Sequence, residues 1–225
     1  MGGKDPGFGV YVHWPFCRRI CPYCDFNVHK DSDIDASRWR SALLSELAHY
    51  AGELEGRTVT SLYFGGGTPS LIEPETVGEI VQAVARHWPV ADDIEITLET
   101  NPTSSERRRL RDFKDAGVNR LSVGVQSFDD DALRFLGRDH SAADAIASLE
   151  DANNVFERVT FDLIYARPGQ SPTDWRDELD RAVRIAGGHL SLYQLPIGSG
   201  TPFFREGVRP ADNDEAADMF ETTQD

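Results

Sequence analysis

Residues 11–27 read YVHWPFCRRICPYCDFN and contain all three cysteines of the 225-residue chain, Cys17, Cys21 and Cys24. Three residues separate the first pair of cysteines and two separate the second pair. This spacing lets one short loop present three thiolates to a single soft-metal centre, which suits an iron–sulfur cluster. Closed zinc sites and electron-transfer clusters normally have four protein ligands. A cubane held by three cysteines would therefore leave one iron open to a small molecule.

The spacing alone leaves two other roles open for these cysteines. Zinc is the main rival, because His13, His29 or Asp25 could supply a fourth ligand, although none of them lies at a usual zinc-finger spacing. Inert buried thiols are the other alternative. A disulfide framework is disfavoured, since an odd cysteine count without a secretory leader indicates a reducing compartment.

The composition indicates one sizeable folded domain and excludes some partners. Of the 225 residues, 40% are hydrophobic and 27% are charged, which is enough for a core of useful size. The chain has 23 Lys and Arg against 38 Asp and Glu, a formal net charge of −15. Binding to nucleic acid is therefore not expected, because contacts with phosphate need clustered cations. A short basic run at residues 107–111 lies within a helical pattern and is expected to be a solvated helix face.

No part of the sequence predicts a membrane span or a secretory leader. Residues 1–7 lack an apolar core, and no window approaches eighteen consecutive apolar residues. We therefore expect a cytoplasmic protein without a transmembrane segment. Residues 214–222 have the pattern of an amphipathic helix without a stop signal, which indicates that the native molecule continues beyond this sequence.

Hydrophobic periodicity predicts alternating strands and helices along the whole chain. Pro74 suits the first turn of one helix, Thr103 and Glu106 have the spacing of a capping box, and Ser171 followed by Pro172 can open another helix. The expected strands are 9–14, 59–64, 94–100, 120–127, 159–166 and 189–197. The expected helices are 35–54, 74–88, 103–116, 129–136, 141–153, 171–186 and 214–222.

Six strands alternating with helices predict a parallel sheet, either doubly wound or barrel-like. Polar or glycine residues follow nearly every expected strand: the cysteines, GGG at 65–67, ETNP at 99–102, Gln126-Ser127, Asp162 and Gln194. In a barrel these residues would meet at one rim, where active sites are built, whereas in a doubly wound sheet they would not all meet. The pattern therefore favours a complete or partial barrel.

Several specific motifs resemble one known family. The cysteine pattern CxxxCxxC with Tyr23 before the last cysteine resembles the signature of the radical S-adenosylmethionine (SAM) superfamily. The similarity extends from Gly9 to Phe203 through GGGTPS at 65–70, GVQSFD at 124–129, DLIYARPGQ at 162–170 and HLSLYQL at 189–195. Within the superfamily, YVHWPFC and CPYCDFN resemble the branch of oxygen-independent coproporphyrinogen III oxidases and the related heme chaperones.

This resemblance implies an α/β fold, a partial (βα)6 TIM-type barrel over residues 9–205. Residues 1–8 would be a flexible N-terminus, and residues 206–225 would begin a C-terminal extension. It also implies a 4Fe-4S cluster on Cys17, Cys21 and Cys24, and SAM bound beside it. Glu99 suits the ribose hydroxyls or amino group of SAM, and Arg138 suits its carboxylate as a bidentate partner. The full set of SAM residues implied is Tyr11, Tyr23, Gly66, Gly67, Thr68, Glu99, Gln126, Arg138 and Asp162.

The resemblance implies a role in heme metabolism and leaves three functions to compare. The first is a heme chaperone that carries heme as cargo to an acceptor hemoprotein, with an electron donor for the cluster. The second is a coproporphyrinogen oxidase that decarboxylates propionates through a 5′-deoxyadenosyl radical, and the third is a non-catalytic zinc-binding module. Oxidases of this branch carry a further cysteine where this chain has Phe26, which favours the chaperone. Whether SAM is cleaved, and hence whether the protein is an enzyme, stays open.

Overall fold

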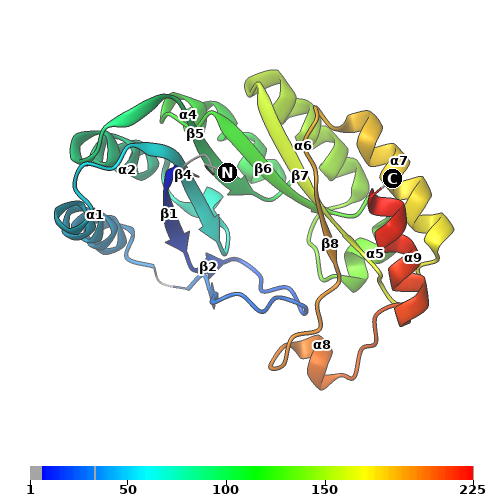
Figure 1. The fold of residues 1–225 in the computed structure, drawn as a ribbon. Coiled ribbons are helices and arrows are strands. Elements are labelled where there is room, and N and C mark those ends of the chain that lie inside the picture. Colours follow the sequence, from blue (N-terminus) through cyan, green and yellow to red (C-terminus); the bar gives the residue numbers. More distant parts are fainter. Residues whose placement is uncertain (1–6, 33, 225) are drawn as a thin grey trace, which may run out of the picture.

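We analysed a computed structural model that describes residues 7–32 and 34–224. Its centre is one curved parallel sheet of six strands in the order β1-β4-β5-β6-β7-β8 (Figure 1). Because this spatial order follows the order of the strands in the chain, the sheet is not doubly wound, and the expected partial barrel is confirmed. The strands are β1 Phe8–Trp14, β4 Val59–Gly66, β5 Val90–Thr100, β6 Arg120–Gln126, β7 Arg158–Tyr165 and β8 Ser191–Gln194.

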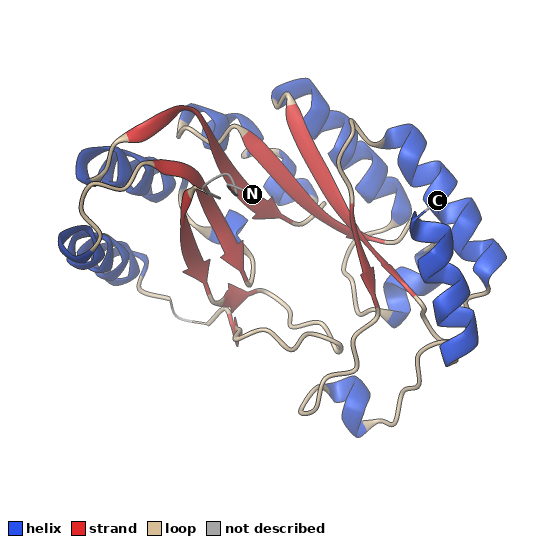
Figure 2. Ribbon diagram, viewed as in Figure 1, coloured by secondary structure: helices blue, strands red, loops and turns tan. Residues whose placement is uncertain are grey.

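Helices cover the convex side of this sheet (Figure 2). In Figure 1, α1 and α2 lie beside β1 and β4, while α6, α7 and α9 lie at the opposite end. The longer helices are α1 Ala36–Glu53, α2 Pro74–His87, α6 Ala142–Val155, α7 Pro172–Ile185 and α9 Asn213–Gln224. Short helical segments are η1 Pro69–Leu71, α3 Ser104–Arg107, α4 Leu110–Asp115, α5 Asp130–Phe135 and α8 Pro202–Arg205. None of the described helices is long and apolar enough to cross a bilayer.

The core lies between the sheet and the helices. Alternate strand residues such as Leu62, Phe64 and Leu98 are at most 1% exposed and pack in one apolar cluster with the helices. Side chains at the intervening positions face the concave side, because successive residues of a strand point to opposite faces. Tyr63 and Glu99 belong to this second set. The alternation therefore separates a dry core from a polar concave face.

Two features of the sequence-based prediction are wrong around residues 103–111. The expected helix 103–116 is divided into α3 and α4, and Thr103 donates its hydroxyl to Glu106 (2.6 Å) without capping the helix backbone. The basic run is only partly solvated. Arg107 pairs with Asp151, and Arg109 reaches the carbonyl oxygens of Ser70 and Ile72 as well as Glu73. Arg108 and Arg111 are exposed as expected.

Candidate functional site

The cysteine loop lies where β1 ends and is closed at its base by two very short strands, β2 Phe16–Cys17 and β3 His29–Lys30. The His29 amide donates to the Pro15 carbonyl (2.7 Å), and the Asp31 amide donates to the Cys17 carbonyl (2.7 Å). A further turn, from the Cys24 amide to the Cys21 carbonyl (3.1 Å), brings the last two cysteines together. These backbone hydrogen bonds therefore set the course of the loop that carries all three cysteines.

All three cysteines are free thiols, with Cys17 buried and the other two half-buried. Burial raises the pKa of Cys17 and of Cys24, and the neighbouring thiols raise it further. Thiols that disfavour each other's ionisation suit a cationic centre that would relieve the repulsion. No three His, Cys, Asp or Glu side chains in the described residues are arranged around a single metal ion. Three cysteines on one loop can serve a cubane cluster, because each cysteine of such a site binds a different iron.

The triple glycine forms the end of β4, since Gly65 and Gly66 are still strand residues and the strand is two residues longer than the expected 59–64. This glycine turn packs directly against the cysteine loop. The Gly67 amide donates to the Trp14 carbonyl (2.7 Å), and the Thr68 amide donates to the Phe16 carbonyl (2.9 Å). A Cβ on Gly67 would lie 2.7 Å from the Phe16 carbonyl oxygen and 2.9 Å from Cys17 Sγ. Only glycine allows this close approach of backbone to sulfur. The sequence predicted Gly67 as a SAM residue but did not indicate this contact.

Glu99, the penultimate residue of β5, lies on the concave face, where it accepts hydrogen bonds from Tyr63 Oη (2.8 Å) and the Gly66 amide (3.1 Å). Burial raises the pKa of Glu99, while these two bonds lower it. Tyr11 stacks on Tyr63 at a centroid distance of 6.0 Å, yet 58% of Tyr11 stays exposed. Glu99 therefore holds the glycine turn and also faces the accessible side of the sheet.

Asp162 lies on β7 at a position of the concave face, level with Ser191 of β8. Burial, with a contribution from the charge of Glu99, raises the pKa of Asp162 to about 7. Burial raises the pKa of Tyr193, and the charge of Asp162 raises it further. Two carboxyl groups therefore share the concave face and bind protons more readily than usual.

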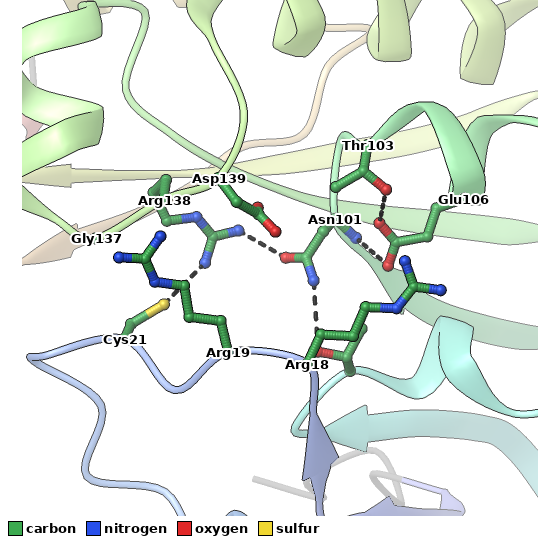
Figure 3. A pocket seen from close by; sticks show the side chains of 10 residues that line it. Arg18, Arg19, Cys21, Asn101, Thr103, Glu106, Gly137, Arg138 and Asp139 are labelled. Atoms are coloured by element: carbon green, nitrogen blue, oxygen red, sulfur yellow. Dashed lines mark hydrogen bonds between the residues drawn. The ribbon is translucent and has the colours of Figure 1, made fainter. Parts of the chain in front are cut away.

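Arg138 follows α5 and extends toward the cysteine loop (Figure 3). Its guanidinium group donates to Cys21 Sγ (3.3 Å), Asn101 Oδ1 (2.6 Å) and the Gly124 carbonyl (2.9 Å). Within the described residues its buried Nε has no acceptor. An oxygen ligand such as a carboxylate would satisfy that donor, so the residue fits its predicted role. The contact with Cys21 was not predicted.

Gln126 lies beside Arg138 at the end of β6. It is 9% exposed and has φ +69°, an uncommon conformation for a residue with a side chain. Gln126 Nε2, Arg138 Nη2 and Asn101 Oδ1 all lie within 3.4 Å of the point where Gly124 would carry a Cβ. The small residue at 124 thus makes room for three polar groups at the rim.

The structure brings the predicted SAM residues into two adjoining groups. Tyr23, Thr68, Gln126 and Arg138 lie around the cysteine loop, and Asn101 joins them through a hydrogen bond to Thr68 Oγ1 (3.4 Å). Tyr11, Glu99 and Asp162 face the concave side, and the Gly66 amide links the two groups through Glu99. The small pocket between the cysteine loop and β5 is also lined by Arg18, Arg19, Thr103, Glu106 and Asp139.

Two parts of the site were not predicted from the sequence. Asn101 lies in the motif ETNP but was interpreted as a turn residue, and Asn followed by Pro at a strand end was the available signal. The segment around α8 contacts the cysteine loop, since the Phe203 amide donates to the Pro22 carbonyl (3.0 Å) and Phe203 packs on Tyr23. No local pattern predicts that long-range contact.

Comparison with known proteins gives consistent matches over most of the chain. The family model "Radical SAM superfamily" matches residues 11–182. The mitochondrial radical S-adenosyl methionine domain-containing protein 1 of Bos taurus is 44% identical over 218 residues, which are 94% of this chain and 49% of that protein. Heme chaperone HemW of Escherichia coli (strain K12) is 37% identical over 223 residues, which are 97% of this chain and 58% of that protein.

Among solved structures, coproporphyrinogen III oxidase (HemN) from Escherichia coli, described as a radical SAM enzyme, has a TM-score of 0.83 and 26% identity. The match covers 96% of this chain and 51% of that one. The chain therefore spans about half the length of the curated relatives it matches.

Proposed function

Because the chain belongs to the radical SAM superfamily, we propose that it is a heme chaperone carrying a 4Fe-4S cluster and SAM. Its cargo is heme, which it passes to an acceptor hemoprotein. Identities of 33–37% to proteins named heme chaperone HemW, over 89–97% of this chain, support this choice. The expected cytoplasmic location and the domain boundaries belong to the same proposal.

The observation that carries the cofactor part is the packing of the glycine turn on the cysteine loop. Cys17, Cys21 and Cys24 would hold the cluster. Having no side chains, Gly66 and Gly67 let the backbone pack against His13 and against Cys17 Sγ, which keeps this strand end beside the cysteine loop. Together the two cofactors supply one-electron reductive chemistry.

The surrounding side chains would bind and orient SAM. The Arg138 guanidinium, with its unsatisfied Nε, suits the SAM carboxylate, and Glu99 suits ribose hydroxyls or the amino group. Gln126 and Thr68 offer neutral hydrogen-bonding groups at the rim. Tyr11, Tyr23 and Asp162 complete the proposed set on the aromatic and concave sides.

The main alternative is a coproporphyrinogen oxidase, which the structural similarity to HemN supports. Phe26 weighs against this activity, because oxidases of this branch carry a cysteine there. Phe26 is 65% exposed, so packing in the core does not explain why a phenylalanine occupies this position. A zinc-binding module is disfavoured by the family match.

Anaerobic reconstitution with iron and sulfide tests the proposal on the full chain. We expect about four irons per chain, a stable complex in a heme titration followed by absorbance, and no decarboxylation of coproporphyrinogen. Cys21→Ala should lose the cluster. Ile20→Ala, on the same loop and 41% exposed, is the matched control and should keep it.

Other results would overturn the proposal in distinguishable ways. Turnover of coproporphyrinogen without heme binding would identify an oxidase. Zinc uptake without cluster formation would contradict the proposed cofactors. A cluster that forms equally well in Cys21→Ala would remove Cys21 from the ligand set.

A further inference from the structure

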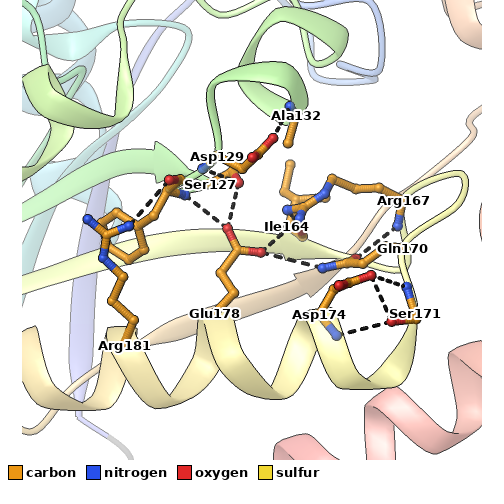
Figure 4. Close-up of polar contacts among 11 residues, drawn as sticks. Ser127, Asp129, Ala132, Ile164, Arg167, Gln170, Ser171, Asp174, Glu178 and Arg181 are labelled. Atoms are coloured by element: carbon orange, nitrogen blue, oxygen red, sulfur yellow. Dashed lines mark hydrogen bonds and ion pairs between the residues drawn. The ribbon is translucent and has the colours of Figure 1, made fainter.

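Glu178, on α7, joins two loops of the rim through both oxygens of its carboxylate (Figure 4). Its Oε1 accepts from Ser127 Oγ (2.5 Å) and the Phe128 amide (2.9 Å). Its Oε2 accepts from Arg167 Nη2 (2.7 Å) and more distantly from Gln170 Nε2 (3.4 Å). The side chains of Glu178 and Arg167 are each only 9% exposed. The carboxylate therefore connects the loop after β6 with the loop after β7 in a water-poor setting.

Each of these loops begins with a residue in an uncommon backbone conformation. Gln126 (φ +69°) and Ala166 (φ +58°) are the two non-glycine residues with positive φ in the described part of the chain. Such residues persist where the surrounding contacts hold them. Ser127 directly follows Gln126, and Arg167 directly follows Ala166. Glu178 is therefore hydrogen-bonded to the residue after each of these two.

The contacts continue from Glu178 to Arg138 through the same loop. Ser127 Oγ accepts from the Asp129 amide (3.1 Å), and the Asp129 carboxylate caps α5 by accepting from the Ala132 amide (2.7 Å). The helix α5 then leads into Gly137 and Arg138. Gln126 and Arg138, the two polar groups gathered beside Gly124, thus stand at opposite ends of a segment that Glu178 anchors.

A second contact from α7 supports the same loop. Arg181, one turn after Glu178, donates to the Phe128 carbonyl (3.4 Å) and lies 4.9 Å from the centroid of the Phe128 ring. Both the amide and the carbonyl of Phe128 are therefore bonded to α7. The helix thus sets the position of this loop from outside the sheet.

We propose that Glu178 is a positioning residue for SAM, one that sets the places of Gln126 and Arg138 without touching the ligand. The inference rests on the proposed SAM site, and it assigns to α7 a role in ligand binding. If Glu178 only stabilised the fold, its substitution would change the stability of the protein alone. A positioning residue would change the affinity for SAM while leaving the cluster intact.

The test compares Glu178→Gln with Ser127→Ala and the double variant in the reconstituted full chain. Asp180→Asn is the matched control, because it removes the same negative charge from α7 at an exposed position. We expect about a tenfold increase in the Kd for SAM by calorimetry in each single variant, because small misplacements of binding groups are costly. The double variant should bind SAM no more weakly than Glu178→Gln, since both changes disturb the same hydrogen bond, between Ser127 and Glu178. Iron content should not change.

Wild-type affinity in Glu178→Gln, with only a lower melting temperature, would overturn the positioning role and leave the proposed function standing. If Glu178→Gln does not fold, Ser127→Ala carries the test, because it keeps the pair between Arg167 and Glu178. Wild-type affinity in Ser127→Ala would then overturn the proposal. If the wild-type protein takes up the cluster but binds no SAM, the proposed SAM site fails, and the positioning role with it.

Discussion

At the scale of single residues, Gly67 shows how strongly the glycine turn and the cysteine loop depend on each other. Gly67→Ala would place a methyl group 2.9 Å from Cys17 Sγ and 2.7 Å from a backbone oxygen. We expect a loss of about 1–3 kcal/mol in the free energy of unfolding and a lower iron content after reconstitution. Denaturant titration and iron analysis measure the two effects.

Gly187→Ala is the control for this change, because a Cβ there would meet nothing within 4 Å. It should leave both stability and iron content near the wild-type values. Equal iron content in both variants would show that the cysteine loop tolerates the added methyl group.

Asp162 predicts a pH dependence of stability. Its pKa is raised from the ordinary 3.8 to about 7 by burial and by Glu99, with Arg138 and Ser191 acting in the opposite direction. Between about pH 4 and pH 7 the folded protein holds a proton that the unfolded chain has released. Stability therefore falls as pH rises through this window, by up to roughly 4 kcal/mol. Urea denaturation across the window measures this slope.

Asp162→Asn should remove most of that slope, because the amide does not titrate. Asp93→Asn, a change at an exposed acid of β5, should retain it. Parallel stability curves for the two variants would contradict the assignment of the slope to Asp162.

At the scale of secondary-structure elements, Glu106 of α3 connects the ends of two neighbouring strands. It is 4% exposed and accepts from Ser70 Oγ (2.6 Å) after β4, and from Thr103 Oγ1 (2.6 Å) and the Asn101 amide (3.4 Å) after β5. Glu106→Gln should lower the free energy of unfolding by about 1–3 kcal/mol, because an amide nitrogen cannot accept one of these bonds. Denaturant titration measures the loss.

Glu150→Gln, at an exposed position on α6, is the matched control and should be close to neutral. A loss as small as that of the control would mean that the loops after β4 and β5 hold together without the carboxylate.

Most of the strands and the longer helices were predictable from their apolar periodicity, whereas β8 is only Ser191–Gln194, shorter than the expected strand 189–197. The helix expected at 103–116 was not among the predictable elements, since Arg109 turns back to the carbonyl oxygens of Ser70 and Ile72 and interrupts it. The strands β2 and β3 contain two residues each, too few for any periodicity. Local patterns therefore predict elements that are stable through their own apolar face, and they miss those formed by distant contacts.

At the scale of the whole molecule, the candidate site was predictable where a motif concentrates its residues. Cysteine spacing identified one loop, and the strand-end motifs identified Glu99 and Gln126. Glu178 and Asn101 were missed, because a single polar residue shows no pattern until the chain is folded. The parallel order of the sheet brings the strand ends together, so the fold converts scattered motifs into one rim.

The described sheet has two edge strands, β1 and β8, and each pairs with another strand on one side only. A closed eight-stranded barrel is filled by its own side chains and leaves little room inside. With six strands the described sheet is a crescent, and its concave side lies between the two edge strands. We therefore expect the six-stranded crescent to offer a ligand more room on its concave side than a closed barrel of eight strands would.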